Sequence, residues 1–135
     1  EAKTAPEAGN APREGETRFA GGGMARLGLG PRWRCVFAND FDPGKRAAYG
    51  ANFGLDHHSA EDIHQLRPDD LPKGTADLAW ASAPCQDLSL AGARGGLAAA
   101  RSGAFFGFWR LIEGLGDARR APRLVVIENV AGLLS

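Results

Sequence analysis

Hydrophobic residues in this chain gather in short runs that alternate with polar or amphipathic segments. Three compact apolar runs with polar ends lie at residues 35–40 (CVFAND), 76–83 (ADLAWASA) and 123–130 (RLVVIENV). Runs of this length that are apolar almost throughout are typical of parallel strands buried on both faces. The pattern therefore predicts one strand in each of the three runs.

Two helices are predicted between these runs. Asp42 and Pro43 have the residue types favoured at the N-cap and the first position of a helix. We expect this helix to run to about Asn52 and to end at Gly54. Farther along, apolar residues recur at steps of three and four over about residues 104–116, as one face of an amphipathic helix requires. The residues of that stripe are Phe105, Phe108, Trp109, Ile112 and Leu115.

Strands that alternate with helices predict an α/β fold with a doubly wound, mostly parallel sheet. Ligands of such sheets bind outside the carboxyl ends of the strands. The stretch before Phe19 has a different character, because its first 17 residues contain no Val, Ile, Leu, Met or aromatic residue. We therefore expect a flexible tail over residues 1–17 and one domain over residues 18–135.

The composition limits the kinds of surface, compartment and metal site that this chain can be expected to have. Sixteen basic and sixteen acidic residues give a formal net charge of zero, so composition alone does not indicate a nucleic-acid or membrane surface. No apolar run approaches the ~18 residues of a membrane span. Cys35 and Cys85 lack a paired spacing and a secretory signal, which favours a reducing, cytoplasmic compartment. His57, His58 and His64 lie in polar sequence without metal-ligand spacing, so we expect them to be exposed and expect no metal site.

Two features suit a nucleotide-like ligand. The glycines of FAGGGM, residues 19–24, allow the backbone to turn tightly and to approach a ligand without interference from a Cβ atom. Asp40 ends the next predicted strand, where a carboxylate receives ribose hydroxyls in dinucleotide-binding folds. The structural alternatives are a plain turn for the glycines and helix capping for Asp40 and Asp42.

A cysteine and a glutamate follow the other two predicted strands. Pro84 ends the second run and places Cys85 at the functional edge of the sheet. A lone cysteine is most often a small buried hydrophobe, which is our interpretation of Cys35. For Cys85, Glu128 at the end of the third run supplies a carboxyl group that can hold or donate a proton opposite a thiolate nucleophile. The pair predicts nucleophilic catalysis, with a purely structural glutamate as the alternative.

Five motifs, in this order and with these separations, make the chain resemble the DNA cytosine-5 methyltransferase family: FAGGGM, NDFD, APCQDLS, RSGAFF and IENV. The similarity covers roughly Phe19 to Leu134, and Pro-Cys-Gln together with Glu-Asn-Val is highly specific. A dehydrogenase would account for the glycines and Asp40 but not for these two motifs. The resemblance implies a truncated Rossmann-like fold that depends on S-adenosylmethionine, with residues 18–135 as a partial catalytic domain.

The resemblance also implies roles for individual residues. Cys85 would add to C6 of a cytosine flipped out of the duplex while Glu128 engages N3, so that C5 can take the methyl group of S-adenosylmethionine. Asp40 would bind the ribose hydroxyls of the cofactor, and Phe41 would pack on its adenine. The other residues implied at the cofactor are Phe19, Gly21, Gly23, Asp62, Ile63 and Pro84. The residues implied at the DNA are Gln86, Ser89, Arg94 and Arg101, in or beside a loop over residues 87–101.

The chain also departs from the family pattern. The family normally has an apolar strand ending in Asp-Leu-Phe before the first glycines, whereas Thr17 and Arg18 stand here, so the central strand is not clearly predicted. Past IENV the family continues with an arginine-bearing motif, further strands and a target-recognition region.

We therefore expect this chain alone to be inactive and to reach double-stranded DNA only in the complete enzyme, with a carboxyl-terminal complementing segment as a partner. The resemblance also implies a place in restriction-modification. A tRNA cytosine-5 methyltransferase of the same family is one alternative. A non-catalytic fragment that at most binds S-adenosylmethionine is the other.

Overall fold

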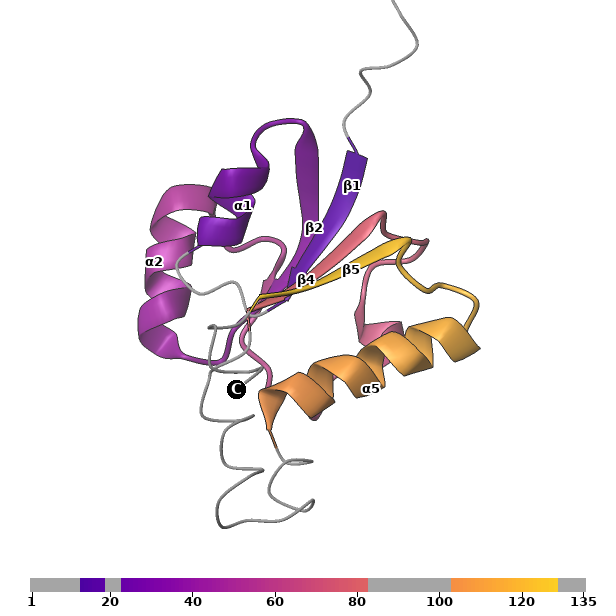
Figure 1. The fold of residues 1–135 in the computed structure, drawn as a ribbon. Coiled ribbons are helices and arrows are strands. Elements are labelled where there is room, and N and C mark those ends of the chain that lie inside the picture. Colours follow the sequence, from indigo (N-terminus) through magenta and orange to yellow (C-terminus); the bar gives the residue numbers. More distant parts are fainter. Residues whose placement is uncertain (1–12, 19–22, 83–102, 129–135) are drawn as a thin grey trace, which may run out of the picture.

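The computed structural model describes residues 13–18, 23–82 and 103–128 (Figure 1). Its strands are β1 (Arg13–Arg18), β2 (Trp33–Asn39), β3 (His58–Ser59), β4 (Leu78–Ser82) and β5 (Leu124–Glu128). Its helices are α1 (Met24–Leu29), α2 (Pro43–Phe53) and α5 (Ala104–Asp117), with a 3-10 turn η1 (Pro68–Asp70). Among these described helices, none combines the length and the apolar character that crossing a membrane requires. The three predicted strands are confirmed as β2, β4 and β5, and the two predicted helices as α2 and α5.

The strands form one parallel sheet with helices on both faces. Its strand order is β3-β2-β1-β4-β5, and each neighbouring pair of strands is parallel. Figure 1 shows α1 and α2 on one side of the sheet and α5 on the other. The chain moves outward from β1 through β2 to β3 and then returns to the other side of β1 as β4. This doubly wound arrangement confirms the predicted fold class and puts the topological switch point between β1 and β4.

The central strand β1 lies mostly in the stretch that the sequence analysis assigned to a tail. Gly15 of β1 is in register with Cys35 of β2 and with Leu78 of β4, so this strand is paired on both sides. The expected tail is therefore wrong for residues 13–17. The reason is that pairing of main-chain groups with two neighbours places a central strand, and such pairing leaves no signal in amino-acid composition.

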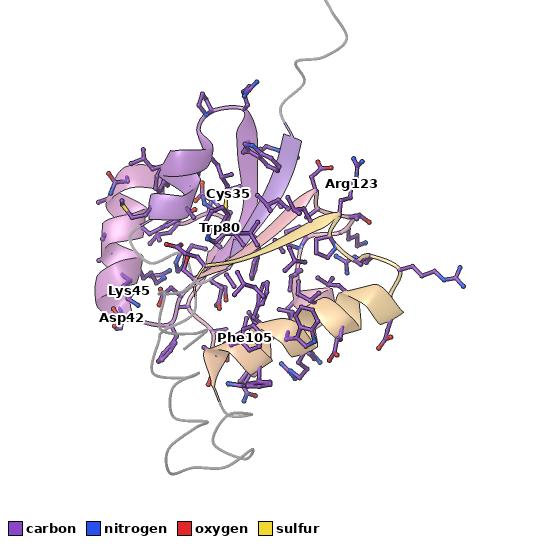
Figure 2. The ribbon with its side chains drawn as sticks, viewed as in Figure 1. Cys35, Asp42, Lys45, Trp80, Phe105 and Arg123 are labelled. Carbon is purple, nitrogen blue, oxygen red and sulfur yellow. The ribbon has the colours of Figure 1, made fainter. Side chains whose placement is uncertain are left out.

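Helix α2 begins and ends as the sequence predicts. The Asp42 carboxylate accepts a hydrogen bond from the main-chain N–H of Lys45 at 2.9 Å, and Pro43 occupies the first helical position, where it gives up no helical hydrogen bond (Figure 2). Gly54 closes the helix with φ 72°, in the left-handed region that favours glycine. These local signals fix the position of α2 directly after the end of β2.

The larger part of the core lies between the sheet and α5. Its residues are Phe37, Ile63, Leu66, Leu71, Ala79, Ala81, Phe108, Leu111, Ile112 and Leu115. The predicted apolar stripe of α5 is wrong at Trp109, which is 41% exposed and whose indole N–H donates to Glu113 at 3.2 Å. Leu111 is buried in its place, because the buried face of α5 is centred on Phe108, Leu111, Ile112 and Leu115.

Candidate active site

Predicted site residues that the structure describes lie at the carboxyl ends of the strands. Asp40 directly follows β2 and Glu128 ends β5, and because the strands are parallel these ends share one edge of the sheet. Gly23 precedes α1 on the path from β1. The other predicted site residues lie outside the described ranges: Phe19, Gly21, Pro84, Cys85, Gln86, Ser89, Arg94 and Arg101. Their roles stay predictions.

Asp40 is held in a buried turn at the end of β2. Asp40 is 6% exposed, and its main-chain N–H donates to the Ser59 carbonyl at 3.2 Å. One carboxylate oxygen, Oδ1, accepts from the main-chain N–H of Asp42 at 2.9 Å, which fixes the orientation of the side chain. Asp42, not Asp40, caps α2. The two aspartates therefore differ in role, and helix capping does not account for Asp40.

Phe41 directly follows Asp40 in the sequence and exposes its aromatic side chain. The side chain is 68% exposed, whereas Asp40 before it is buried. An open aromatic face beside a fixed carboxylate suits a ligand that carries both a planar ring and hydroxyl groups.

Asn39 is a site-supporting residue that the sequence analysis missed. Its side chain is buried, and Nδ2 donates to the carbonyls of Ser59 at 3.2 Å and Glu61 at 2.8 Å. These bonds tie the end of β2 to the segment after β3. The available signal was a polar residue that closes an apolar strand, since such a residue needs buried hydrogen-bond partners.

Asp62 and Ile63, predicted at the cofactor, have different surroundings. Asp62 is exposed, and its Oδ1 accepts from the main-chain N–H of His64 at 2.9 Å. Ile63 is buried in the core under α5, where its Cγ2 would lie 2.6 Å from a Cβ atom added at Gly107. The side chain of Ile63 therefore serves the core, and only its main chain is left for the predicted ligand contact.

Arg110 of α5 holds the segment that contains Ile63 in place through its main-chain carbonyls. Its Nη2 donates to the carbonyls of Ile63 at 3.2 Å, His64 at 2.9 Å and Leu66 at 3.0 Å. A charged donor with three carbonyl partners holds a loop more strongly than neutral hydrogen bonds do. Sequence reasoning missed Arg110, whose signal was a single basic residue in a helix that is mostly apolar.

Gly23 has a packing reason to be glycine. Its φ is 88°, and a Cβ atom at this position would lie 2.3 Å from Cε2 of Phe53 and 3.3 Å from Cδ2 of Tyr49. Glycine therefore permits both the left-handed turn and the close approach of α1 to α2. The contact of Gly23 with a ligand stays a prediction.

Glu128 is anchored to the neighbouring strand. Glu128 is exposed, and its Oε2 accepts a hydrogen bond from Oγ of Ser82 at 2.7 Å. The parallel pairing of β4 and β5 sets these two residues directly opposite each other. The carboxylate is thus oriented at the sheet edge, where it can exchange a proton with a bound molecule. Ser82 was not predicted, and its partner lies too far away in sequence to be inferred.

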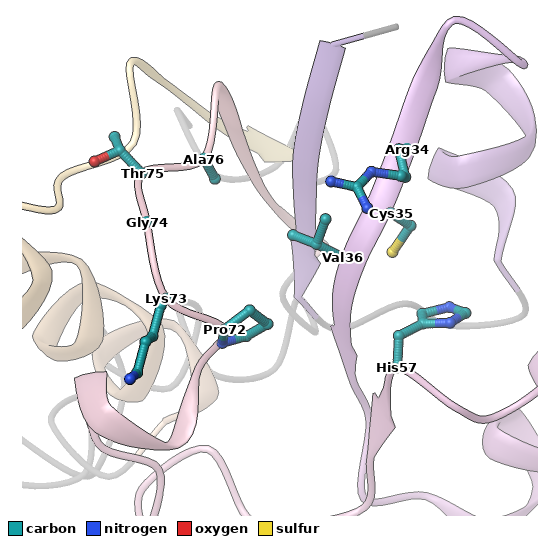
Figure 3. A pocket seen from close by; sticks show the side chains of 9 residues that line it. All are labelled: Arg34, Cys35, Val36, His57, Pro72, Lys73, Gly74, Thr75 and Ala76. Carbon is teal, nitrogen blue, oxygen red and sulfur yellow. The ribbon is translucent and has the colours of Figure 1, made fainter.

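A hollow of about 360 Å³ lies elsewhere on the surface (Figure 3). It is lined by residues 34–36 in the first half of β2, by His57 and by the loop over residues 72–76 that leads into β4. In a parallel sheet these positions belong to the amino ends of β2 and β4, away from Asp40 and Glu128. We assign this hollow no part in the site.

A polar cluster between α1, α2 and β3 corrects the expectation that the histidines are exposed. His57 and His64 are half-buried, and His58 is only 9% exposed. Nε2 of His57 lies 2.7 Å from Nη1 of Arg26 and 2.6 Å from the hydroxyl of Tyr49. Burial, and then the charge of Arg26, lower the pKa of His57, so the ring is held neutral. Tertiary packing buries the histidines, and polar neighbours in sequence do not reveal it: His57 and His58 lie against Tyr49 of α2, and His64 lies against Gly107 of α5.

His58 makes folding sensitive to pH. Within the described part of the chain neither ring nitrogen has a hydrogen-bond partner, and the ring centroid lies 5.0 Å from that of Tyr49. Burial, and then the charge of Arg46, lower the pKa of His58 below its ordinary value of 6.5. The unfolded chain therefore takes up protons first, and stability that is fully present above this value is lost as the pH falls below it.

We expect the melting temperature to fall between about pH 7.5 and about pH 5.5, the range in which an ordinary histidine gains its charge. His58→Phe keeps an aromatic ring and removes one of the titrating groups, so it should make this fall smaller. Circular dichroism melts of both proteins across this range measure the effect. An equal fall in parent and variant would show that His58 is not responsible.

The chain is similar to known proteins over most of its length. A family model described as C-5 cytosine-specific DNA methylase matches residues 18–135. The Bacillus subtilis Type II methyltransferase M.BsuFI is 34% identical over 118 residues, which are 87% of this chain and 27% of that protein. The Haemophilus aegyptius Type II methyltransferase M.HaeII is 35% identical over 117 residues, 85% of this chain and 34% of that protein. The chain thus spans about a quarter to a third of the length of these relatives.

Solved structures show the same fold. The S. pombe Dnmt2 methyltransferase matches with a TM-score of 0.62 and 23% identity, over 89% of this chain and 35% of that chain. A Spodoptera frugiperda DNMT2 variant matches with a TM-score of 0.63 and 21% identity, over 90% and 37%. The family model covers the described strands from β2 to β5 and includes both carboxylates at the sheet edge. The chain belongs to the C-5 cytosine-specific DNA methylase family.

Proposed function

We propose that this domain takes part in transferring a methyl group from S-adenosylmethionine to C5 of cytosine in DNA. The observation that carries the proposal is the placement of Asp40 and Glu128 at one sheet edge, on either side of the switch point between β1 and β4. Strand β4 ends at Ser82, and the sequence continues from there directly to Pro84 and Cys85. Ligands of doubly wound sheets bind at this edge.

The described residues fit the cofactor by their chemistry. The fixed carboxylate of Asp40 can accept hydrogen bonds from two neighbouring ribose hydroxyls, and the open ring of Phe41 can pack on an adenine. The segment over residues 61–63 follows β3. Asn39 ties this segment to the end of β2 and so keeps it close to Asp40 and Phe41. S-adenosylmethionine, when bound, supplies an activated methyl group.

Cys85 and Glu128 would make C5 of the cytosine reactive. An aromatic C5 is a poor nucleophile, so the thiolate of Cys85 adds to C6 while Glu128 holds a proton at N3, and the displaced electron pair becomes available at C5. The methyl donor would leave as S-adenosylhomocysteine. C5 would then lose its proton to water, and the electrons of that C–H bond would re-form the C5–C6 double bond and expel the thiolate, while the proton at N3 returns to Glu128. The net change replaces one hydrogen by one methyl group. Arg94 and Arg101 would contact phosphates.

DNA is the favoured substrate because the curated relatives are Type II methyltransferases and the matching family model is one of DNA methylases. These relatives favour a role in restriction-modification. The cytoplasm keeps thiols reduced, which preserves a free nucleophilic cysteine, so we assign the activity to the cytoplasm. Transfer to tRNA is the alternative that the same chemistry allows.

A chimera tests the proposal. Residues 18–135 replace the matching segment of M.BsuFI, and labelled S-adenosylmethionine is offered with duplex DNA, with tRNA or with DNA containing 5-fluorocytosine. We expect label in DNA and a covalent protein–DNA adduct with 5-fluorocytosine, where the C5 position cannot lose a proton. The isolated 135-residue chain should give neither, since its neutral net charge provides little phosphate attraction. Label in tRNA alone would favour the alternative, and label in neither would contradict the proposal.

The cofactor site predicts a loss of affinity in Asp40→Ala. Removing a carboxylate that accepts hydrogen bonds from ribose should weaken binding of S-adenosylmethionine by about 1–3 kcal/mol, the scale of a lost hydrogen bond to a charged group. Isothermal titration calorimetry on the isolated chain measures this loss. The control is Asp42→Asn, which removes a neighbouring charge but keeps a good helix cap and should bind as the parent does. Equal affinities for Asp40→Ala and the parent would remove Asp40 from the site.

A further inference from the structure

Three side chains at the ends of β4 and β5 form a continuous hydrogen-bonded chain. Nε1 of Trp80 donates to Oγ of Ser82 at 3.1 Å, and Oγ of Ser82 donates to Oε2 of Glu128 at 2.7 Å. Trp80 is labelled in Figure 2, which shows it within the sheet. The shorter distance is typical of a hydroxyl that donates to a carboxylate. The chain therefore begins on a half-buried indole and ends on the exposed carboxylate.

The sheet itself brings these residues together. Trp80 is in register with Val126, and Ser82 with Glu128, so alternate positions of the two strands share one face. The alternate positions Ala79 and Ala81 pack into the core under α5, which places the chain of hydrogen bonds on the opposite face. The geometry therefore depends on paired strands and not on a loop.

The directions of the hydrogen bonds follow from the donors available. An indole N–H can only donate, so Ser82 must accept from Trp80 and has its single hydroxyl hydrogen left for Glu128. That bond engages Oε2 and leaves Oε1 outside this set of contacts. An exposed glutamate otherwise samples several rotamers, and holding one of them removes an entropic cost when the carboxylate meets its substrate.

We propose that Ser82 is a positioning residue for Glu128 and that the indole of Trp80 fixes the direction of the Ser82 hydroxyl. This inference rests on the proposed function, in which Glu128 holds a proton at N3 of the cytosine. Ser82 presents the carboxylate at the sheet edge with one oxygen already occupied, so Oε1 is the atom that carries the proton to the base. In this role Ser82 acts through Glu128.

Nuclear magnetic resonance on the 135-residue chain tests the geometry. The indole N–H of Trp80 should shift, and should exchange faster with solvent, in Ser82→Ala. It should respond less in Glu128→Gln, which leaves the hydroxyl in place. The indole of Trp109 is an internal control, because it donates to Glu113 on the far side of the molecule and should not respond. A Trp80 signal that is unchanged by Ser82→Ala would overturn the proposed contact.

Steady-state kinetics on the chimera test the role. Ser82→Ala should lower kcat about 10-fold with the KM values for DNA and S-adenosylmethionine unchanged, because a misdirected catalytic group slows the chemical step. Trp80→Phe keeps a ring but loses the N–H, and should lower kcat by a smaller factor. Ser82→Thr keeps a hydroxyl and a strand-favouring side chain, and should recover most of kcat. The control Thr75→Ala removes an exposed hydroxyl before the amino end of β4 and should have no effect.

The outcomes separate this inference from the proposed function. If Glu128→Gln lowers kcat strongly and Ser82→Ala does not, Glu128 keeps its proposed role and the positioning role of Ser82 is wrong. If Glu128→Gln leaves kcat unchanged, the proposed role of Glu128 is wrong. If Ser82→Ala instead changes only the melting temperature, Ser82 is a structural link between two strands.

Discussion

Cys85→Ser in the chimera should reduce methyl transfer by at least about 1,000-fold while leaving the melting temperature nearly unchanged. A thiol is partly ionised near neutral pH and its thiolate is the attacking species, whereas a serine hydroxyl stays protonated and adds poorly to C6 unless a base activates it. Without the addition, C5 has no electron pair to accept the methyl group. The measurements are incorporation of labelled methyl groups into duplex DNA and covalent capture on DNA that contains 5-fluorocytosine.

Cys35→Ser is the matched control. Cys35 is half-buried in β2, where its Sγ lies 3.5 Å from the Phe37 carbonyl and 3.6 Å from the Tyr49 hydroxyl. A serine hydroxyl can use both of these partners, so the exchange should cost little stability and should spare transfer. Transfer that persists in Cys85→Ser, or that is lost in Cys35→Ser, would contradict the assignment of Cys85 as the nucleophile.

Local signals in the sequence were sufficient for several elements of the fold. Helix α2 was predictable because Asp42, Pro43 and Gly54 act within a few residues of their own positions, through capping and backbone preference. Strands β2, β4 and β5 were predictable because compact apolar runs with polar ends are typical of parallel strands. The expected burial on both faces is wrong for β5, where Leu124 is 54% and Ile127 is 39% exposed. The order of these elements was enough to predict a doubly wound sheet and the edge at which Asp40 and Glu128 lie.

Other features depend on partners that are distant in sequence. Strand β1 is defined by pairing with β2 and β4, and its residues do not follow an apolar pattern. Ser82 meets Glu128, and Arg110 meets the carbonyl of His64, across separations of 46 residues in each case. Such contacts follow from strand register and helix packing, and composition, capping and periodicity do not encode them.

The sequence also did not fully predict which side of α5 faces the core. The observed orientation of this helix predicts a large loss of stability when its most buried aromatic residue is removed. Steps of three and four placed Phe105, Phe108 and Trp109 on one stripe, whereas the structure buries Phe108 completely and leaves Trp109 41% exposed. Phe108→Ala should therefore lower the free energy of unfolding by about 3–5 kcal/mol, because it opens a cavity in a packed core. That is a large part of the ~5–15 kcal/mol that stabilises an ordinary domain.

Trp109→Ala is the control that distinguishes observed burial from sequence periodicity. It removes a larger side chain than Phe108→Ala does, but from the exposed side of α5, so we expect a loss below about 1 kcal/mol. Urea unfolding followed by circular dichroism gives both values, and Phe108→Leu, with a smaller cavity, provides a measurement if Phe108→Ala does not fold. Arg110 on the same helix holds the carbonyls of Ile63 and His64, so loss of α5 packing should also loosen the segment predicted at the cofactor. Equal losses in Trp109→Ala and Phe108→Ala would mean that the stripe read from the sequence, and not the observed phase of α5, faces the core.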